Sequence, residues 1–242
     1  MNTLRTRIKI CGLTREQDVD SAVAAGVDAV GFVLYRKSQR YVSIERAAEL
    51  AKRLPAFITP VLLYVNEDPA TIHAHCSLLP NATLQFHGDE TAAQCKEASL
   101  NGARAYLRAA RVPLGDDAFA FDLVKYAQDY SNAQAILLDA HVDGYGGGGK
   151  VFNWSLLPAN VNAHLVLSGG LNAANVADGI LQVRPRCKTL AVDISSGVEM
   201  DGPDGQTVKG IKDADKINRF CAAVRAADGQ LAGITHERLP TA

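Results

Sequence analysis

Short apolar runs recur along the chain at nearly regular intervals, and their spacing constrains the fold more than any other feature. Eight such runs begin about 26 residues apart on average, a distance that holds one strand, one helix and two loops. The runs occupy residues 7–11, 28–35, 58–65, 83–87, 103–108, 134–139, 164–168 and 189–194. This spacing predicts eight consecutive strand–helix units.

Several runs are apolar along their whole length, as at 29–34 and 135–138. Parallel strands that are covered on both faces have this composition. Eight units in 242 residues predict an α/β protein that folds as a (β/α)8 TIM barrel in a single domain, and a doubly wound open sheet is the alternative. No linker divides the chain, so we expect the barrel at 1–226 and a poorly ordered C-terminal tail at 227–242.

Residues that cap helix N-termini precede several of the helical segments. The sixth connection between strands, at 154–158, is expected to be short. The expected caps are Thr14 (in a capping box with Gln17), Ser43, Asp68, Asn172 and Asp213.

The charge balance excludes several classes of partner. Lys and Arg number 25 against 26 Asp and Glu, so the broad basic field of a nucleic-acid or membrane binder is missing. No secretory signal follows Met1, and the longest apolar stretch, at 58–65, is too short to span a membrane. Five cysteines without a C-x-x-C pair favour a reducing compartment. We therefore expect a cytoplasmic protein that is a monomer or a homodimer.

In a barrel of this kind, functional groups lie at the carboxyl ends of the strands. The seventh run ends in Ser168-Gly-Gly170 and the eighth in Ser195-Ser-Gly197. Glycine lets backbone N–H groups approach an anion, and these two loops commonly hold phosphate in barrels. Asn172 is expected to open a helix whose positive end favours the same anion. We therefore predict a phosphorylated small-molecule substrate, with ordinary glycine turns as the alternative.

Cys11 ends the first run and Asp139 ends the sixth. Because side chains alternate along a strand, Lys9 shares a face with Cys11, and Leu137 shares a face with Asp139. A thiol whose pKa is lowered can act as a base near neutral pH, and a partly desolvated carboxyl group can act as an acid. The alternatives are a small buried Cys11 and an Asp139 that only caps or anchors the backbone.

Lys9 and Asp193 are expected to point inward from neighbouring strands and to form an ion pair. Alternatively, Lys9 forms the Schiff base of an aldolase-type lyase. Arg40 offers a planar guanidinium that suits a carboxylate, and a surface arginine is the other interpretation. His87 is either a substrate contact or a packed polar residue.

The glycine-rich segment at 144–150 partly matches nucleotide-binding patterns. Val151 stands where a P-loop requires Ser or Thr, and the segment follows the sixth run rather than the first. We therefore expect a mobile loop over the site. His73 and His75 are two residues apart on a helix and face different ways, so we predict no catalytic metal.

Six motifs follow one another at the expected strand ends. They are Lys9-Ile-Cys11-Gly-Leu-Thr14, Ser38-Gln-Arg40-Tyr-Val, Leu84-Gln-Phe-His87-Gly-Asp-Glu90, Leu137-Leu-Asp139 with Gly146-Gly-Gly-Gly-Lys150-Val-Phe-Asn-Trp154, Leu167-Ser-Gly-Gly-Leu171 and Val192-Asp-Ile-Ser-Ser-Gly-Val-Glu199. Together they resemble the phosphoribosylanthranilate isomerase family, in order from residue 7 to residue 222. Other phosphosugar barrels share only the glycine turns.

The resemblance implies an Amadori rearrangement in tryptophan biosynthesis, from N-(5-phosphoribosyl)anthranilate to 1-(2-carboxyphenylamino)-1-deoxyribulose 5-phosphate. It implies that Cys11 is the general base, that Asp139 is the general acid and that Arg40 holds the anthranilate carboxylate. It also implies that no cofactor is needed, because a protonated imine serves as the electron sink. The expected substrate-binding residues are Arg40, Gly169, Gly170, Asp193, Ser195, Ser196 and Gly197.

The chain departs from the family pattern at two places. Asn153 stands where the family usually has Asp, and the segment 200–210 is longer than usual. We expect the longer segment to extend the rim on the phosphate side or to contact a neighbouring molecule. The related sugar isomerase of histidine biosynthesis uses two aspartates, so Cys11 argues against it. A non-catalytic barrel that binds a phosphometabolite is the other alternative.

Overall fold

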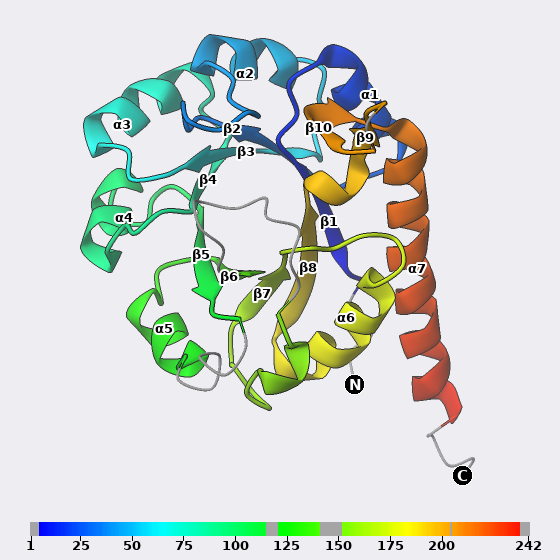
Figure 1. The fold of residues 1–242 in the computed structure, drawn as a ribbon. Helices are drawn as coiled ribbons and strands as arrows, with labels where there is room; N and C mark the ends of the chain where they lie inside the picture. The colour runs from blue at the N-terminus through cyan, green and yellow to red at the C-terminus, as the bar shows by residue number, and fades with distance from the viewer. Residues whose placement is uncertain (1–4, 115–120, 141–151, 204, 238–242) are drawn as a thin grey trace.

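The computed structural model describes residues 5–114, 121–140, 152–203 and 205–237. Eight parallel strands close into a barrel in chain order, as Figure 1 shows in a view roughly along the barrel axis. The strands are β1 Arg7–Cys11, β2 Ala29–Val33, β3 Thr59–Tyr64, β4 Thr83–Phe86, β5 Tyr106–Val112, β6 Ala135–Ala140, β7 His164–Leu167 and β8 Thr189–Ile194. The predicted TIM barrel is confirmed, and closure between β1 and β8 rules out an open sheet.

Helices surround the barrel, and the sixth connection holds only a short 3-10 turn, as predicted. The α-helices are α1 Glu16–Ala24, α2 Ile44–Ala51, α3 Pro69–Leu78, α4 Ala92–Ala98, α5 Leu123–Asp129, α6 Val176–Val183 and α7 Ala214–Glu237. The 3-10 turns are η2 Trp154–Leu156, η3 Arg184–Arg186 and η4 Ser196–Val198.

Side chains alternate between the two faces of the barrel strands. On β1, Ile8 and Ile10 belong to the main core between the barrel and its helices, whereas Cys11 packs in a separate cluster inside the barrel. On β6, Leu137 likewise points inward. The interior clusters are Cys11, Val33, Leu63 and Val65, and Ala109, Leu137 and Val166. Burial on both faces explains why these strands are apolar along their whole length.

Three of the predicted helix caps are confirmed. In each, a side-chain oxygen accepts a hydrogen bond from the backbone N–H three residues later, which satisfies a donor that the helix itself leaves free. The pairs are Ser43 with Arg46 N at 3.2 Å, Asp68 with Thr71 N at 2.9 Å and Asp213 with Lys216 N at 2.9 Å.

Two predicted caps are wrong. Helix α1 begins after Arg15, and Thr14 instead donates its hydroxyl to the carbonyl of Gly210 at 2.7 Å. Asn172 accepts hydrogen bonds from the next turn, and α6 begins only at Val176 with Asn175 as its N-cap residue. Thr14 has a distant partner that no local pattern reveals, whereas Asn172 bonds locally, to backbone N–H groups two and three residues later, and the helix starts after that turn.

Strand β5 lies several residues later than the predicted run at 103–108. Leu100, Asn101 and Gly102 all have positive φ angles and turn the chain before the strand begins. The strand then pairs with β6 as far as Val112. The second half of the strand, residues 109–112, therefore lies beyond the predicted run.

The long segment after β8 forms a two-stranded antiparallel hairpin, β9 Glu199–Asp201 with β10 Thr207–Lys212. It lies beside α1 at the rim of the barrel (Figure 1), where the bond from Thr14 to Gly210 holds it. The Glu199 end of β9 follows directly on the loop after β8. The extension therefore enlarges the rim next to the predicted phosphate loops.

Helix α7 continues through position 226, where the sequence places the end of the barrel, and runs to Glu237. Ala227 is fully buried, and the Asp228 carboxylate accepts a hydrogen bond from the backbone N–H of Thr6 at 2.7 Å. Asp228 also pairs with Arg184 at 3.1 Å. Tertiary contacts with the start of β1 thus extend the helix over part of the predicted tail.

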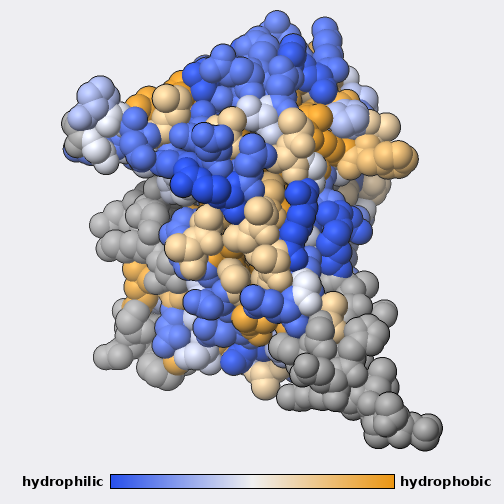
Figure 2. Space-filling view, turned by 90° about the vertical axis from the view of Figure 1, so that its right-hand side faces the viewer, coloured by the Kyte–Doolittle hydropathy of each residue, from blue (hydrophilic) through white to orange (hydrophobic). Residues whose placement is uncertain are grey.

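The face of the molecule that carries α7 is mostly hydrophilic, with residues of intermediate hydropathy near its centre (Figure 2). The exposed positions of this helix include Asp215, Arg219 and Gln230. Among the described residues, no helix is long and apolar enough to cross a membrane.

Candidate active site

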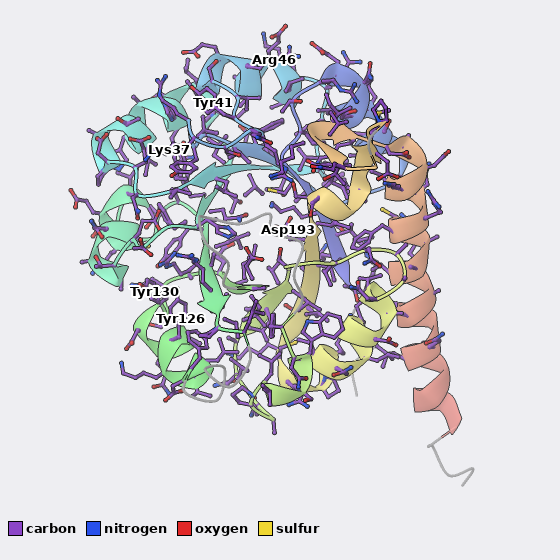
Figure 3. The ribbon with its side chains drawn as sticks, in the orientation of Figure 1. Lys37, Tyr41, Arg46, Tyr126, Tyr130 and Asp193 are labelled. Atoms are coloured by element: carbon purple, nitrogen blue, oxygen red, sulfur yellow. The ribbon has the colours of Figure 1, made fainter. Side chains whose placement is uncertain are left out.

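The predicted ion pair between β1 and β8 is confirmed. Lys9 and Asp193 are neighbours in the strand register, and Lys9 Nζ lies 2.7 Å from Asp193 Oδ1. Both side chains are almost fully buried, and Asp193 lies near the centre of the ring of strands (Figure 3). An ammonium held this closely by a carboxylate stays protonated, which disfavours the Schiff-base interpretation of Lys9.

Cys11 and Lys9 influence each other's protonation. Burial raises the pKa of the Cys11 thiol, and the Lys9 ammonium opposes this shift only in part. Burial by itself would lower the pKa of Lys9, but Asp193 and Cys11 raise it above its usual value. The position of Cys11 in the sequence predicts a thiol whose pKa is lowered. The structure differs because Cys11 is 5% exposed, so desolvation of the thiolate outweighs the nearby cation.

A glycine on the neighbouring strand makes room for both groups. Gly31 pairs with Cys11 in the register of β1 and β2. A Cβ atom at Gly31 would lie 2.7 Å from Cys11 Sγ and 3.0 Å from Lys9 Nζ. Because both distances are shorter than an ordinary contact, a larger residue at position 31 would displace the thiol or the ammonium.

Asp139 lies on the inner face of β6, two residues after the inward Leu137, and is 6% exposed. Its Oδ2 is 3.0 Å from Nε2 of His87, which directly follows β4. Its Oδ1 borders Gly169, where a Cβ atom would lie only 2.8 Å away. Cys11 and Asp139 therefore enter the same barrel interior at the same, carboxyl end of their strands.

The loops after β7 and β8 have the features expected of an anion site. Gly169 and Gly170 have φ angles of 78° and 63°, and a Cβ atom at Gly197 would collide with the carbonyl oxygen of Leu171. Glycine is therefore required for the path of the backbone. Four partly exposed N–H groups in these loops donate no hydrogen bond within the described residues, those of Gly169, Gly170, Ser196 and Gly197.

Arg40 is not a surface arginine, since its side chain is only 10% exposed. Its Nε and Nη2 donate to the two carboxylate oxygens of Glu199, at 2.7 and 2.8 Å. Lys212 also reaches Glu199, at 3.2 Å, and donates to the carbonyl of Ser195 at 2.9 Å. Burial would raise the pKa of Glu199, but Arg40 and Lys212 hold it below its usual value. Burial lowers the pKa of Lys212.

Three polar residues near the site were missed as site residues at the sequence level: Gln85, Glu199 and Lys212. Gln85 could have been found, because it occupies an inward position two residues before His87. Glu199 and Lys212 meet only through the β9–β10 hairpin, and nothing in the local pattern predicts that pairing.

The predicted mobile loop at 144–150 lies outside the described residues. Asn153, just after it, caps the η2 turn by accepting from Ser155 N at 3.1 Å. Asp and Asn serve equally well in this role, which explains why Asn is tolerated where the family usually has Asp.

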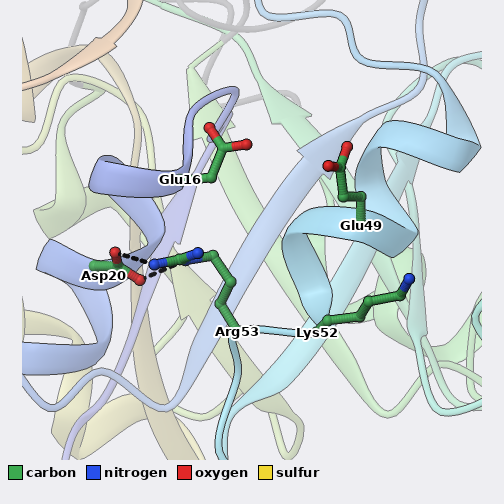
Figure 4. Close-up of a pocket in the computed structure, with 5 residues that line it drawn as sticks. All are labelled: Glu16, Asp20, Glu49, Lys52 and Arg53. Carbon is green, nitrogen blue, oxygen red and sulfur yellow. Dashed lines mark hydrogen bonds and ion pairs between the residues drawn. The ribbon is translucent and has the colours of Figure 1, made fainter.

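A second groove, between α1 and α2, does not have the features of an active site (Figure 4). It lies on the outer helical layer, and its charges pair with one another, as in the bond between Arg53 Nε and Asp20 Oδ1 at 2.6 Å. Neighbouring Arg46 pairs with Glu16 and Glu49 in the same way. Exposed ion pairs of this kind are ordinary surface features. Among the described residues, no cluster of three or more His, Cys, Asp or Glu could hold a metal ion.

A closed barrel has at one mouth a buried thiol, a carboxyl group and loop amides without a partner among the described residues, and this defines the class as a barrel enzyme suited to a phosphorylated sugar. The profile of the family described as N-(5′-phosphoribosyl)anthranilate (PRA) isomerase matches residues 8–223. The chain belongs to this family.

The N-(5′-phosphoribosyl)anthranilate isomerase of Methylibium petroleiphilum is 60% identical over 229 residues, covering 95% of this chain and 98% of that protein. The isomerase of Thermotoga maritima has a TM-score of 0.76 at 38% identity, covering 91% of this chain and 99% of the other. A crystal structure of a phosphoribosyl anthranilate isomerase in complex with reduced 1-(o-carboxyphenylamino)-1-deoxyribulose 5-phosphate has a TM-score of 0.73 at 34% identity. It covers 91% of this chain and 99% of the other.

Proposed function

We propose that this protein is the isomerase of tryptophan biosynthesis that converts N-(5′-phosphoribosyl)anthranilate to 1-(2-carboxyphenylamino)-1-deoxyribulose 5-phosphate. One observation carries the proposal: Cys11 and Asp139 point into the same barrel mouth, beside loops in which four backbone amides have no partner among the described residues. A phosphosugar anchored by those amides would present its reacting carbons to both side chains.

The first step is acid catalysis by Asp139. The carboxyl group gives its proton to the ribose ring oxygen as the bond between C1 and that oxygen breaks, and the anilino nitrogen supplies the electron pair that forms the C1=N imine. The product of this step is a protonated imine. Its positive nitrogen draws electrons from C2, so a metal or organic cofactor is not required for the next step.

The second step is base catalysis by Cys11. The thiolate takes the proton from C2, and the electron pair moves toward the imine nitrogen to give an enolamine, which tautomerises to the ketone. Asp139 has lost a proton and Cys11 has gained one, so the reaction is balanced and solvent exchange restores both groups. Lys9 stabilises the thiolate, because its ammonium opposes the effect of burial on the Cys11 pKa.

The two ends of the substrate have separate binding groups in this proposal. The loop amides of Gly169, Gly170 and Gly197 hold the phosphate. Arg40 holds the anthranilate carboxylate through guanidinium N–H groups that Glu199 leaves free, since Nη1 makes no hydrogen bond within the described residues. Asp193 supports the site by keeping Lys9 in place.

The test is turnover of freshly generated phosphoribosylanthranilate, followed by loss of its anthranilate-type fluorescence. Cys11→Ser and Asp139→Asn should each lower kcat by at least about 10², because each removes one proton-transfer group. Cys187→Ser and Asp129→Asn are the matched controls and should keep wild-type rates, since Cys187 lies on the outer layer and Asp129 is exposed on α5. A wild-type rate in Cys11→Ser would remove it as the base.

The alternatives are separated by the same assay. A non-catalytic phosphometabolite-binding barrel would bind the substrate without turnover. Turnover of only the histidine-pathway aminoaldose would assign the protein to that pathway instead.

We propose that the protein works in the cytoplasm, as a monomer or a homodimer. All five cysteines are free thiols, which fits a reducing compartment. The isomerase of Thermotoga maritima is described as dimeric, and a crystal structure of monomers made from it shows that both oligomeric states occur among similar proteins.

A further inference from the structure

A chain of three buried polar side chains crosses the barrel interior from β4 to β6. Gln85 Nε2 lies 3.0 Å from His87 Nδ1, and His87 Nε2 lies 3.0 Å from Asp139 Oδ2. All three residues are at most 6% exposed. Gln85 and His87 are two residues apart, so the alternation along β4 brings both to the inner face.

The donors and acceptors in this chain specify one form of the histidine. In this structure the Gln85 amide nitrogen faces His87 Nδ1, and since an amide nitrogen can only donate, this orientation pairs with an Nδ1 that carries no proton. In a neutral imidazole the proton then lies on Nε2, which donates to Asp139 Oδ2. Since the carbonyl oxygen of a carboxylic acid is a better acceptor than its hydroxyl oxygen, a hydrogen bond from His87 to Oδ2 favours the acid proton on Oδ1.

We propose that Gln85 and His87 are positioning residues for Asp139: Gln85 holds His87 in the Nε2–H tautomer, and His87 directs the acid proton to Oδ1. The inference rests on the proposed function, because it assigns a task within the acid step. The proton leaves Oδ1 for the ring oxygen of the sugar, and the new carboxylate keeps the hydrogen bond from His87 at Oδ2. No proton moves along the chain, so no further reactant is needed.

Packing alone does not account for a glutamine at this position. Gln85 is fully buried, and its Oε1 has no hydrogen-bond partner within the described residues. An unpaired buried amide oxygen is destabilising, whereas an apolar side chain of equal size would avoid that cost. Within the described residues, the hydrogen bond of this amide is the one to His87.

Two other charged side chains that the structure describes near this chain are engaged in ion pairs. Arg111, next to Asp139 in the register of β5 and β6, lies 3.7 Å from Asp89. Across the interior, Lys9 pairs with Asp193 beside the Cys11 thiol. Among the described side chains, His87 contacts Asp139 directly, through Oδ2.

The tautomer can be measured without any enzyme activity. In protein labelled with ¹⁵N-histidine, the His87 signals, assigned by their loss in His87→Gln, should show a protonated Nε2 and an unprotonated Nδ1 near neutral pH. A proton on Nδ1 would overturn the proposal. Because this measurement does not depend on turnover, failure of the proposed isomerase activity cannot be mistaken for failure of this inference.

Kinetics test the consequence for catalysis. Gln85→Met has nearly the same volume but no donor, and it should lower kcat about tenfold with KM within about twofold, because only the acid step is disturbed. Gln128→Leu, an exposed glutamine on α5, is the control and should keep the wild-type kcat. An unchanged kcat in a folded Gln85→Met protein would overturn the proposal.

Gln85→Glu separates positioning from a purely structural role. A carboxylate can only accept, so neutral His87 would carry its proton on Nδ1 and could not donate to Asp139. Gln85→Glu should therefore lower kcat further than Gln85→Met does, with KM again within about twofold, because it opposes the required tautomer instead of only releasing it. A kcat equal to that of Gln85→Met would contradict the assignment.

Discussion

Cys11 lies beside Lys9 on the inner face of β1, and the two side chains set the pH range in which the thiol can act. Burial raises the pKa of Cys11, so the fraction of thiolate is small at neutral pH and grows as the pH rises. Lys9 counteracts burial, while Asp193 alone would raise the pKa further. The pKa of Cys11, and with it the reactivity of the thiol, therefore depends on the neighbouring ion pair between Lys9 and Asp193, whose two charges act in opposite directions.

Lys9→Met should shift the pH dependence of Cys11. Removing the ammonium also leaves Asp193 unpaired, and both changes raise the pKa of Cys11. The rising limb of kcat/KM between about pH 6 and pH 9 should move to higher pH, with the largest loss of activity on the acidic side. Lys125→Met, an exposed residue on α5, should leave the profile unchanged. A shift toward lower pH would contradict this account.

Gly31→Ala should impair catalysis more than stability. The new methyl group would meet Cys11 Sγ at 2.7 Å, and no positive φ angle at this position adds backbone strain. We expect kcat to fall by about tenfold or more as the thiol is displaced. Gly229→Ala is the matched control, because a Cβ atom there meets nothing within 4 Å. Equal rates in the two variants would show that the gap at Gly31 has no catalytic role.

At the scale of elements, the β9–β10 hairpin ties the predicted carboxylate-binding arginine to the phosphate loops. Glu199 accepts from Arg40, from Gly210 N at 2.8 Å and from Lys212, and Lys212 in turn bonds Ser195. The expected carboxylate site at Arg40 and the expected phosphate loops thus share one buried carboxylate. A substitution of Glu199 should therefore alter the positions of both.

Glu199→Gln should destabilise the protein. It leaves two buried cations, Arg40 and Lys212, without their common counter-charge, and breaking such a pair costs about 3 kcal/mol. Urea unfolding would measure the change, and KM should rise in parallel. Asp201→Asn, two residues along β9, removes an ion pair whose carboxylate is 62% exposed. Its cost should stay below about 1 kcal/mol, and equal effects in the two variants would refute the role of burial.

Helix and strand positions show where sequence patterns were sufficient. The caps at Ser43 and Asp68 were predictable, because the bond from the side chain to the helix N-terminus involves neighbouring residues alone. Thr14 fits the same pattern but bonds the distant Gly210, and Asn172 holds a turn that precedes the helix instead of its first residue. In the active site, strand alternation predicted the inward positions of Cys11 and Asp139, whereas the Glu199 network required the fold of the hairpin.

For the whole molecule, α7 joins the end of the chain to its beginning. Asp228 on this helix bonds the backbone of Thr6, which leads into β1, and pairs with Arg184 after α6. Because β1 and β8 close the barrel, this contact supports the seam of the sheet.

Asp228→Ala should therefore lower the stability of the whole barrel, by about 2 kcal/mol for the loss of charge-assisted hydrogen bonds. Thermal unfolding should show one cooperative transition at lower Tm, together with unchanged kcat at low temperature. Gln230→Ala, exposed on the same helix, serves as the control. If Asp228→Ala unfolds at the wild-type Tm, the contact does not stabilise the barrel.

The sequence by itself determined the barrel, the inward positions of Cys11 and Asp139 and the glycine loops. These features follow from local periodicity and residue type, which repeat in every strand–helix unit. Only the tertiary structure decided the state of the groups: a thiol whose pKa burial raises, an arginine held by Glu199 and a histidine that reaches Asp139 across the interior. Desolvation and pairing depend on residues that are distant in the chain, so no local pattern encodes them.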